Sequence, residues 1–195
     1  MSNDTKTRIL DAAETIMLEK GFNGVGLNEV LAAVKVPKGS FYHYFPSKEQ
    51  FGVELLQHYI ADSIAYKRRM LLSTSPEPNP LNRILSYMES GIGHMCESEG
   101  KCPCLVLKLA SEVASFSDTM RQVLLDGGTE SEVIFQTVIT EGIASGAIRK
   151  ELEPKVATDV VQDLWMGAMH RAQLSRSVAP LRAALAFIRS YLSPQ

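Results

Sequence analysis

The sequence predicts an all-α protein of about nine helices. Apolar residues recur at intervals of three and four along most of the 195 residues, which is the spacing of one face of a helix. No segment alternates apolar and polar residues in the way of a half-buried strand. Proline and glycine interrupt the periodic segments, most clearly at 73–80 (STSPEPNP), and divide the chain into separate helices.

The N-terminal third is expected to form four helices, over residues 5–20, 28–34, 38–44 and 48–72. Gly21 follows the first helix, at the position where glycine often ends one. The segment 35–37 (KVP) ends the second, since proline disfavours the helical region for the residue before it. A further break at 45–47 (FPS) precedes the long fourth helix, for which Ser47 is a suitable N-cap.

The rest of the chain is expected to form five more helices, at about 81–95, 102–114, 117–145, 154–175 and 179–192. We interpret the loop at 73–80 as a connection between two helices of the same domain. The predicted domains are therefore an N-terminal domain over residues 1–47 and a helical domain over residues 48–195.

The overall composition excludes several classes of protein. Apolar residues make up 45% of the chain, which is enough for packed cores in one or two domains. The longest apolar runs are too short to span a membrane. The start of the chain, MSNDTKTRIL, lacks the apolar segment of a secretory signal. We therefore expect a cytoplasmic protein with no membrane partner.

Positive charge gathers locally although the net charge is −2. Residues 1–48 carry six Lys and Arg against five Asp and Glu, and residues 35–48 carry three lysines and no acid. A patch of this kind can bind phosphates on a mildly acidic protein, although a solvated lysine face is the commoner explanation.

The third short helix has the composition of a helix that reads double-stranded DNA. A helix-turn-helix inserts the first turn of its second helix into the major groove, and Gly39 and Ser40 would let the backbone approach closely. Phe41 and Phe45 can anchor this helix to its own core, and a helix so short and aromatic cannot bury every side. The candidate DNA contacts are small or polar residues: Lys38, Gly39, Ser40, Tyr42, His43, Tyr44 and Lys48.

These residues resemble the signature of the TetR family of repressors. The stretch 38–49 (KGSFYHYFPSKE) carries the resemblance, and 8–14 (RILDAAE) with 21–22 (GF) fits the family's first helix. The resemblance covers about residues 5–55. It implies a three-helix DNA-binding domain, a helical ligand-sensing and dimerisation domain, a homodimer formed by the last two helices, and operator DNA as the partner of the seven residues named above.

Two positions depart from the family's pattern. The second helix usually begins with a hydroxyl residue that contacts phosphate, and here Gly26 stands in its place. The turn usually carries glycine where this chain has Lys35. We therefore expect one phosphate contact to be missing and the turn to differ slightly.

Three cysteines lie within nine residues: Cys96, Cys102 and Cys104. A structural disulfide is not expected in a reducing compartment, so clustered thiols suggest redox chemistry, metal binding or coincidence. Pro103 suits the first position of a helix, which makes Cys102 a possible cap and puts Cys104 in the first turn. The helix dipole there favours a thiolate, and Lys108, one turn further on, adds positive charge.

A second resemblance points to the same cysteine. The segments 104–109 (CLVLKL) and 111–113 (SEV) are similar to an electrophile-sensing subgroup of the TetR family, typified by the regulator of N-ethylmaleimide reductase. The subgroup implies that Cys104 reacts with electrophiles or oxidants and that the modified repressor leaves its operator. It also implies a lysine in the penultimate helix, where this chain has Gln173, so Cys96 and Cys102 stay open as resolving thiols.

Three other functions stay open at this point. A metal sensor could use His94 with the three cysteines, although their spacing fits no standard zinc site. A cysteine-dependent enzyme would need a base that the sequence does not place, and phosphate loops and nucleophile elbows are absent. We therefore predict no catalytic residue, no cofactor and no metal site. A reversible apolar ligand could bind among side chains that more often form core or dimer seam: Met88, Met95, Phe116, Trp165, Met166 and Met169.

Overall fold

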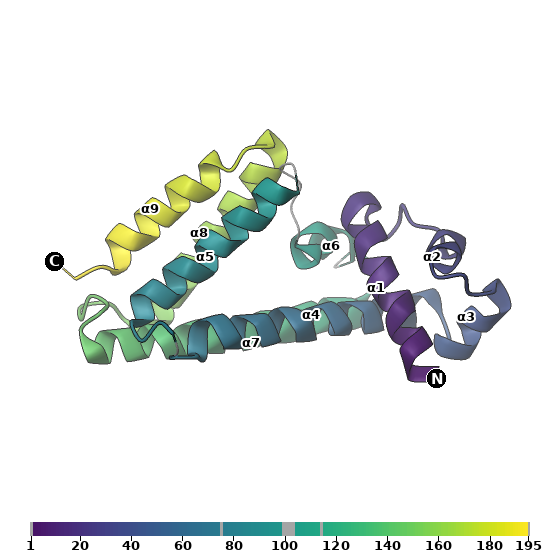
Figure 1. Cartoon of the computed structure of the whole chain (residues 1–195), viewed down its shortest axis with the longest axis horizontal. Coiled ribbons are helices and arrows are strands. Elements are labelled where there is room, and N and C mark those ends of the chain that lie inside the picture. Colours follow the sequence, from purple (N-terminus) through teal and green to yellow (C-terminus); the bar gives the residue numbers. More distant parts are fainter. Residues whose placement is uncertain (1, 75, 99–103, 114, 195) are drawn as a thin grey trace. The chain divides into compact units, whose positions relative to one another are not determined.

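The computed structural model describes residues 2–74, 76–98, 104–113 and 115–194. Over these residues the secondary structure consists of nine α-helices and contains no strand, which confirms the all-α prediction. Figure 1 labels the helices in chain order. They are α1 (Ser2–Lys20), α2 (Leu27–Ala33), α3 (Lys38–Tyr44), α4 (Lys48–Leu72), α5 (Pro80–Glu97), α6 (Leu105–Val113), α7 (Asp118–Ser145), α8 (Pro154–Ser175) and α9 (Ala179–Leu192).

The helices pack into two compact units that do not follow the chain in order. The first unit holds residues 1–62 and 104–127, so α1, α2 and α3 pack together with α6 and the first turns of α4 and α7. The second unit holds residues 63–103 and 128–195, with α5, α8, α9 and the remainder of α4 and α7. No local pattern in the sequence indicates that α6 shares a unit with the N-terminal helices.

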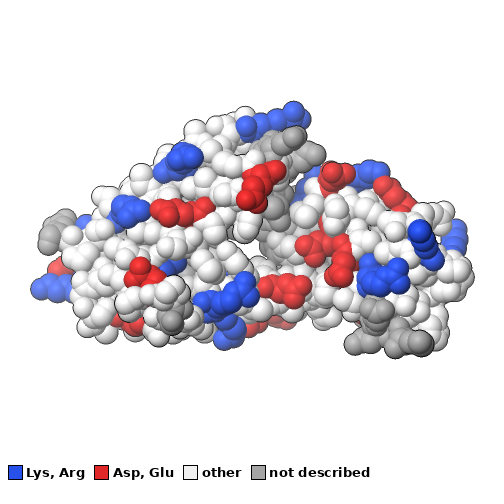
Figure 2. All heavy atoms as spheres, viewed as in Figure 1, with Lys and Arg blue, Asp and Glu red and all other residues white. Residues whose placement is uncertain are grey.

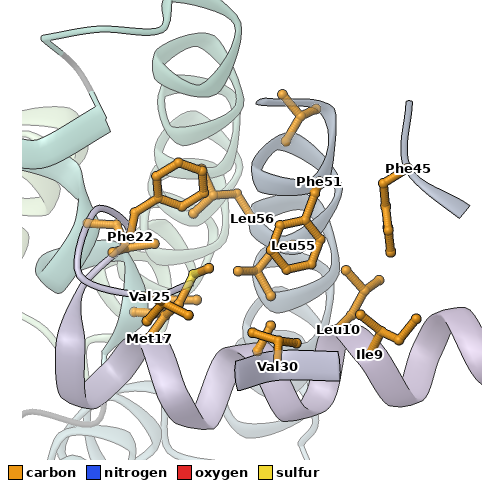
Figure 3. Packing of buried hydrophobic residues seen from close by; sticks show 14 of the residues in the cluster. Ile9, Leu10, Met17, Phe22, Val25, Val30, Phe45, Phe51, Leu55 and Leu56 are labelled. Carbon is orange, nitrogen blue, oxygen red and sulfur yellow. The ribbon is translucent and has the colours of Figure 1, made fainter. Parts of the chain in front are cut away.

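One hydrophobic core holds the first unit together, as Figure 3 shows for part of it. Phe41, Phe45 and Phe51 pack at ring-centroid distances of 5.0 to 5.4 Å and are almost completely buried. These three rings fix α3 against the start of α4, as the four-residue spacing of the first two predicted. Helix α6 contributes buried side chains to the same core: Leu105, Leu109 and Val113.

The turns of the first unit follow the predicted chemistry. Gly21 ends α1 with a φ of 75°, a left-handed conformation that glycine adopts without strain. Ser47 caps α4, since its Oγ accepts a hydrogen bond of 3.0 Å from the Gln50 amide. Lys35 has a φ of 56°, so this turn has the left-handed geometry that usually selects glycine.

The second unit is a helical body in which α5 and α8 both pack against α9. Its core includes Met88, Met95 and Trp165, all buried. Arg83 is buried as well, and its Nη2 forms a 2.5 Å ion pair with Glu141. Among the residues described, no helix is long and apolar enough to cross a membrane.

Candidate functional site

Helix α3 divides its side chains between core and solvent as a DNA-reading helix requires. Phe41 is buried, and Tyr42 beside it is 60% exposed. Every predicted DNA contact is exposed or half-buried, on α3 or at the start of α4: Lys38, Gly39, Ser40, Tyr42, His43, Tyr44 and Lys48. The surface therefore presents these residues together, and their contact with DNA stays a prediction.

The charged groups near α3 are partly engaged within the protein. The Lys48 ammonium lies 5.0 Å from the centre of the Phe22 ring, in a cation–π contact. Lys20, at the end of α1, forms an ion pair with Glu29 on α2. Figure 2 shows acidic and basic side chains interspersed over the visible face, without one large field of either sign. Attraction to phosphate would therefore come from individual side chains.

The start of α2 lacks the cap that the family's pattern would supply. Gly26 occupies the N-cap position with an extended backbone and no side-chain hydrogen bond. A Cβ added there would meet no atom within 4 Å. A serine at this position could accept a hydrogen bond from the Glu29 amide, three residues on.

Replacing Gly26 by serine is expected to stabilise the protein by a few tenths of a kcal/mol, roughly the difference between serine and glycine caps. The added hydroxyl should also bind a phosphate and raise the affinity for operator DNA. Gly26→Ala is the matched control, because it adds the Cβ without an acceptor. Urea titration measures the stability of each variant, and gel-shift titration measures its affinity for DNA. Equal stability and equal DNA affinity in the two variants would contradict this account.

Two long-range contacts hold the N-terminal helices in place. The Arg8 guanidinium on α1 donates a 3.1 Å hydrogen bond to the Val34 carbonyl at the end of α2. Glu112 on α6 accepts hydrogen bonds of 3.0 and 3.1 Å from the amides of Phe22 and Asn23, in the turn after α1. The second contact ties α6 directly to the turn that follows α1, in the unit that carries the predicted DNA contacts.

Cys104 lies at the N-terminus of α6 and acts as its cap. The Leu107 amide donates to Cys104 Sγ at 3.5 Å, and the Lys108 amide donates to the Cys104 carbonyl at 3.1 Å. The prediction that Cys104 lies in the first turn of the helix is wrong, because the helix begins at Leu105; the prediction that Cys102 caps the helix is not tested. Cys102 itself lies outside the described residues. Cys104 is half-buried and carries a free thiol.

Tyr59 on α4 lies against the sulfur of Cys104. Its hydroxyl hydrogen-bonds to the Cys104 side chain and to the backbone of Leu105. Burial raises the pKa of Tyr59, and the charge of a Cys104 thiolate raises it further. Tyr59 therefore stays protonated and can donate a hydrogen bond to the sulfur. Sequence reasoning missed this residue, since 45 positions separate it from Cys104 and no local spacing connects the two.

A group of charged side chains lies beside Tyr59, between α1 and α4. His58 Nε2 is 2.8 Å from Asp11 Oδ1. Burial raises the pKa of Glu14; His58 opposes this increase, whereas Asp62 and Asp11 add to it. The negative charge of Glu14 also contributes to the raised pKa of Tyr59. Helix α1 thus approaches the same site as α4 and α6.

The other described sensing candidates differ from Cys104 in their unit or in their burial. Cys96 is exposed on α5, in the second unit, whereas Cys104 belongs to the first. Lys108 is half-buried one turn into α6. Among the described residues, no group of three or more His, Cys, Asp or Glu side chains could hold a metal ion.

The apolar side chains considered for a reversible ligand differ in burial and are divided between the two units. Met88, Met95 and Trp165 are buried in the second unit, whereas Phe116 belongs to the first unit, is 48% exposed and stacks on Phe22. Met166 is exposed on α8.

The arrangement of a three-helix unit with a solvent-facing third helix, followed by a helical body, defines a class of DNA-binding regulators. Residues 9–55 match the model of the tetR family of bacterial regulatory proteins, and residues 80–188 match that of the tetracyclin repressor-like C-terminal domain. The chain belongs to the TetR family. It is a DNA-binding transcriptional regulator and not an enzyme.

Particular relatives resemble the chain over nearly its full length. The HTH-type transcriptional repressor NemR of Escherichia coli is 36% identical over 192 residues, covering 98% of this chain and 95% of the relative. The repressor DhaR of a Mycobacterium species is 31% identical over 191 residues, covering 97% and 92%. The crystal structure of reduced E. coli NemR matches with a TM-score of 0.88 over 97% of this chain and 98% of the other, at 33% identity.

Proposed function

We propose that the protein is a cytoplasmic repressor that binds its operator as a reduced homodimer and leaves it when an electrophile modifies Cys104. The observation that carries this proposal is the position of Cys104. It caps a helix that belongs to the same packed unit as the DNA-reading surface. Similarity to repressors, one of them described in a reduced form, supports the same function.

The reaction needs only the thiolate and an electrophile. With N-ethylmaleimide, the sulfur of Cys104 forms a bond to one alkene carbon, and the π electron pair moves to the adjacent carbonyl to give an enolate. Water protonates the enolate, and the thiol proton has already passed to solvent. No oxidant or metal takes part. The product is a thioether, whose sulfur is a weaker hydrogen-bond acceptor than the thiolate that reacted.

Modification is expected to reach the DNA-reading surface through α6. An added group at the sulfur disturbs the cap of α6, and Glu112 near the other end of that helix holds the amides of Phe22 and Asn23. Movement of α6 and of the long helix α4 would change the placement of α3. Two states with different affinity for DNA are sufficient for regulation.

Dimerisation is expected to use α8 and α9, in line with the family. These helices expose large apolar side chains, among them Leu174 at 73% and Phe187 at 53%. A second copy covering this surface would remove those side chains from water. It would also set the spacing of two half-sites, one helical turn of DNA or a multiple of it apart.

The proposal is tested by binding the protein to DNA from upstream of its own gene, with and without N-ethylmaleimide. We expect the wild type to be released and Cys104→Ser to stay bound, since serine can cap α6 but is not alkylated. Cys96→Ser is the matched control and should be released like the wild type. A Cys104→Ser protein that is released, or an alkylated wild type that stays bound, would refute sensing through this cysteine.

A further inference from the structure

We infer that Phe22 is a positioning residue for the binding of DNA: its ring holds the ammonium of Lys48 where that group can contact a phosphate. The inference does not depend on the sensing role of Cys104, and it rests on the predicted contact of Lys48 with DNA. It starts from a contact between two segments that lie apart in the sequence. The Lys48 ammonium, at the start of α4, lies 5.0 Å from the centre of the Phe22 ring, in the turn after α1.

The Phe22 ring is fixed by its surroundings and can therefore serve as a rigid support. It is 3% exposed and belongs to the hydrophobic core of the first unit (Figure 3). The backbone of α4 packs directly against it at Gly52, where an added Cβ would come within 2.7 Å of the ring. The ring of Phe116, in the turn between α6 and α7, stacks on Phe22 at a centroid distance of 5.7 Å.

The place of this ring on α4 suits the orientation of the lysine side chain. Lys48 and Gly52 lie four residues apart and therefore on the same face of the helix. The ring that packs at Gly52 is thus one helical turn from the backbone of Lys48. A mobile lysine side chain loses rotamer freedom when it binds a phosphate, and a side chain that the ring already holds loses less.

Contact with a ring preserves the charge that a phosphate contact needs. The ammonium of Lys20, in the same unit, is paired with the carboxylate of Glu29. A ring attracts a cation through its quadrupole and carries no net charge, so Lys48 keeps its positive charge and its N–H donors. The acid next to it, Glu49, accepts a hydrogen bond of 2.5 Å from the Ser117 hydroxyl. That carboxylate is therefore engaged at the start of α7.

The test is a double-mutant cycle of Phe22→Leu and Lys48→Ala in the whole chain, with DNA from upstream of its own gene as the probe. Leucine keeps an apolar side chain in the core and cannot attract a cation as a ring does. With Lys48 present, we expect Phe22→Leu to weaken DNA binding about tenfold, because ordering each lysine side chain costs roughly threefold in affinity and the proposed dimer carries two. With Lys48→Ala, the same change should alter the affinity by less than about twofold.

The dependence of the affinity on salt concentration gives a second measurement. Lys48→Ala removes a phosphate contact, so the slope of log affinity against log salt should become shallower by about 0.9 for each subunit. Phe22→Leu keeps the ammonium and should keep the slope. Arg69→Ala is the matched control, since Arg69 lies 5.2 Å from the centre of the Tyr66 ring in the second unit. This variant should bind DNA like the parent.

Three results would overturn the inference. The first is a Phe22→Leu protein that binds DNA as tightly as the parent. The second is a loss of affinity that is equally large with Lys48→Ala, which would show that the ring acts only through the fold. The third is a Lys48→Ala protein with unchanged affinity and salt dependence, since the predicted phosphate contact would then be absent.

Urea titration shows whether Phe22→Leu folds. If it does not, Phe116→Leu takes its place in the cycle, because Phe116 is 48% exposed and supports the Phe22 ring from the surface. We then expect a loss of about threefold with Lys48 present and none with Lys48→Ala, and an equal loss in both would again overturn the inference. Failure of sensing through Cys104 is a separate result, read from alkylated wild type that stays on DNA.

Discussion

Replacing Gly39 by alanine is expected to stabilise the free protein and to weaken its complex with DNA at least about 30-fold. In the free protein a Cβ at this position would meet no atom within 4 Å. Alanine stabilises a helix by roughly 0.5–1 kcal/mol relative to glycine, so the free energy of unfolding should rise. In the proposed complex the same methyl group would lie against the DNA, where overpacking costs about 1–3 kcal/mol for each helix, and the proposed dimer carries two such helices.

Gly128→Ala is the matched control for this change. Gly128 is an exposed glycine of α7 with equally open surroundings, in the second unit. Its replacement should stabilise the protein by about 1 kcal/mol and leave the affinity for DNA unchanged. Titration with operator DNA measures the affinity for DNA, and unfolding in denaturant measures the stability of the protein. If the Gly39→Ala protein binds DNA as tightly as wild type, the prediction that α3 contacts DNA is wrong.

Replacing Glu112 by alanine is expected to lower the stability of the first unit by about 2 kcal/mol. One carboxylate oxygen accepts both amides of the turn after α1, at 3.0 and 3.1 Å. Hydrogen bonds to a charged group are worth about 1.5–3 kcal/mol each, and the exposed Asn23 amide regains water in the variant. The amides of Phe22 and Asn23 should lose protection against hydrogen exchange, which NMR resolves residue by residue.

Glu112→Gln separates the hydrogen bonds from the charge. Its carbonyl oxygen can accept both amides, so most of the stability and protection should return. Measuring exchange at the two amides is preferable to tryptophan fluorescence, because Trp165 lies on α8 in the second unit. Full protection of both amides in Glu112→Ala would show that the turn is held by other contacts.

The sequence predicted the helices well and the contacts between them poorly, for a physical reason. Helix positions follow from local periodicity, proline and capping residues, and every predicted boundary that falls on a described residue lies within three residues of the structure. Tyr59 and Cys104 lie 45 residues apart, and Glu112 and Phe22 lie 90 apart. Nothing local in the chain marks such pairs, because they depend on how helices pack.

Cys104 illustrates the same limit at short range. Its place at the start of a helix was predicted, and its exact role as the cap was not. By its ring geometry proline suits a first helical position, which predicts a helix that includes Cys104, whereas the helix begins at Leu105 and Cys104 caps it. The exposed side of α3 is easier to predict, since Phe41 and Phe45 define the buried side of this segment and leave the other side chains to solvent.

The shared core of the first unit has a consequence for how such regulators diversify. Leu105, Leu109, Val113 and Met120 are buried among the same side chains as Ile9 and Phe51. A gene fusion that joined residues 1–62 to a foreign sensory half would leave one wall of this core open to water. The exchangeable module is therefore discontinuous: a viable chimera has to inherit residues 104–127 together with the N-terminal helices.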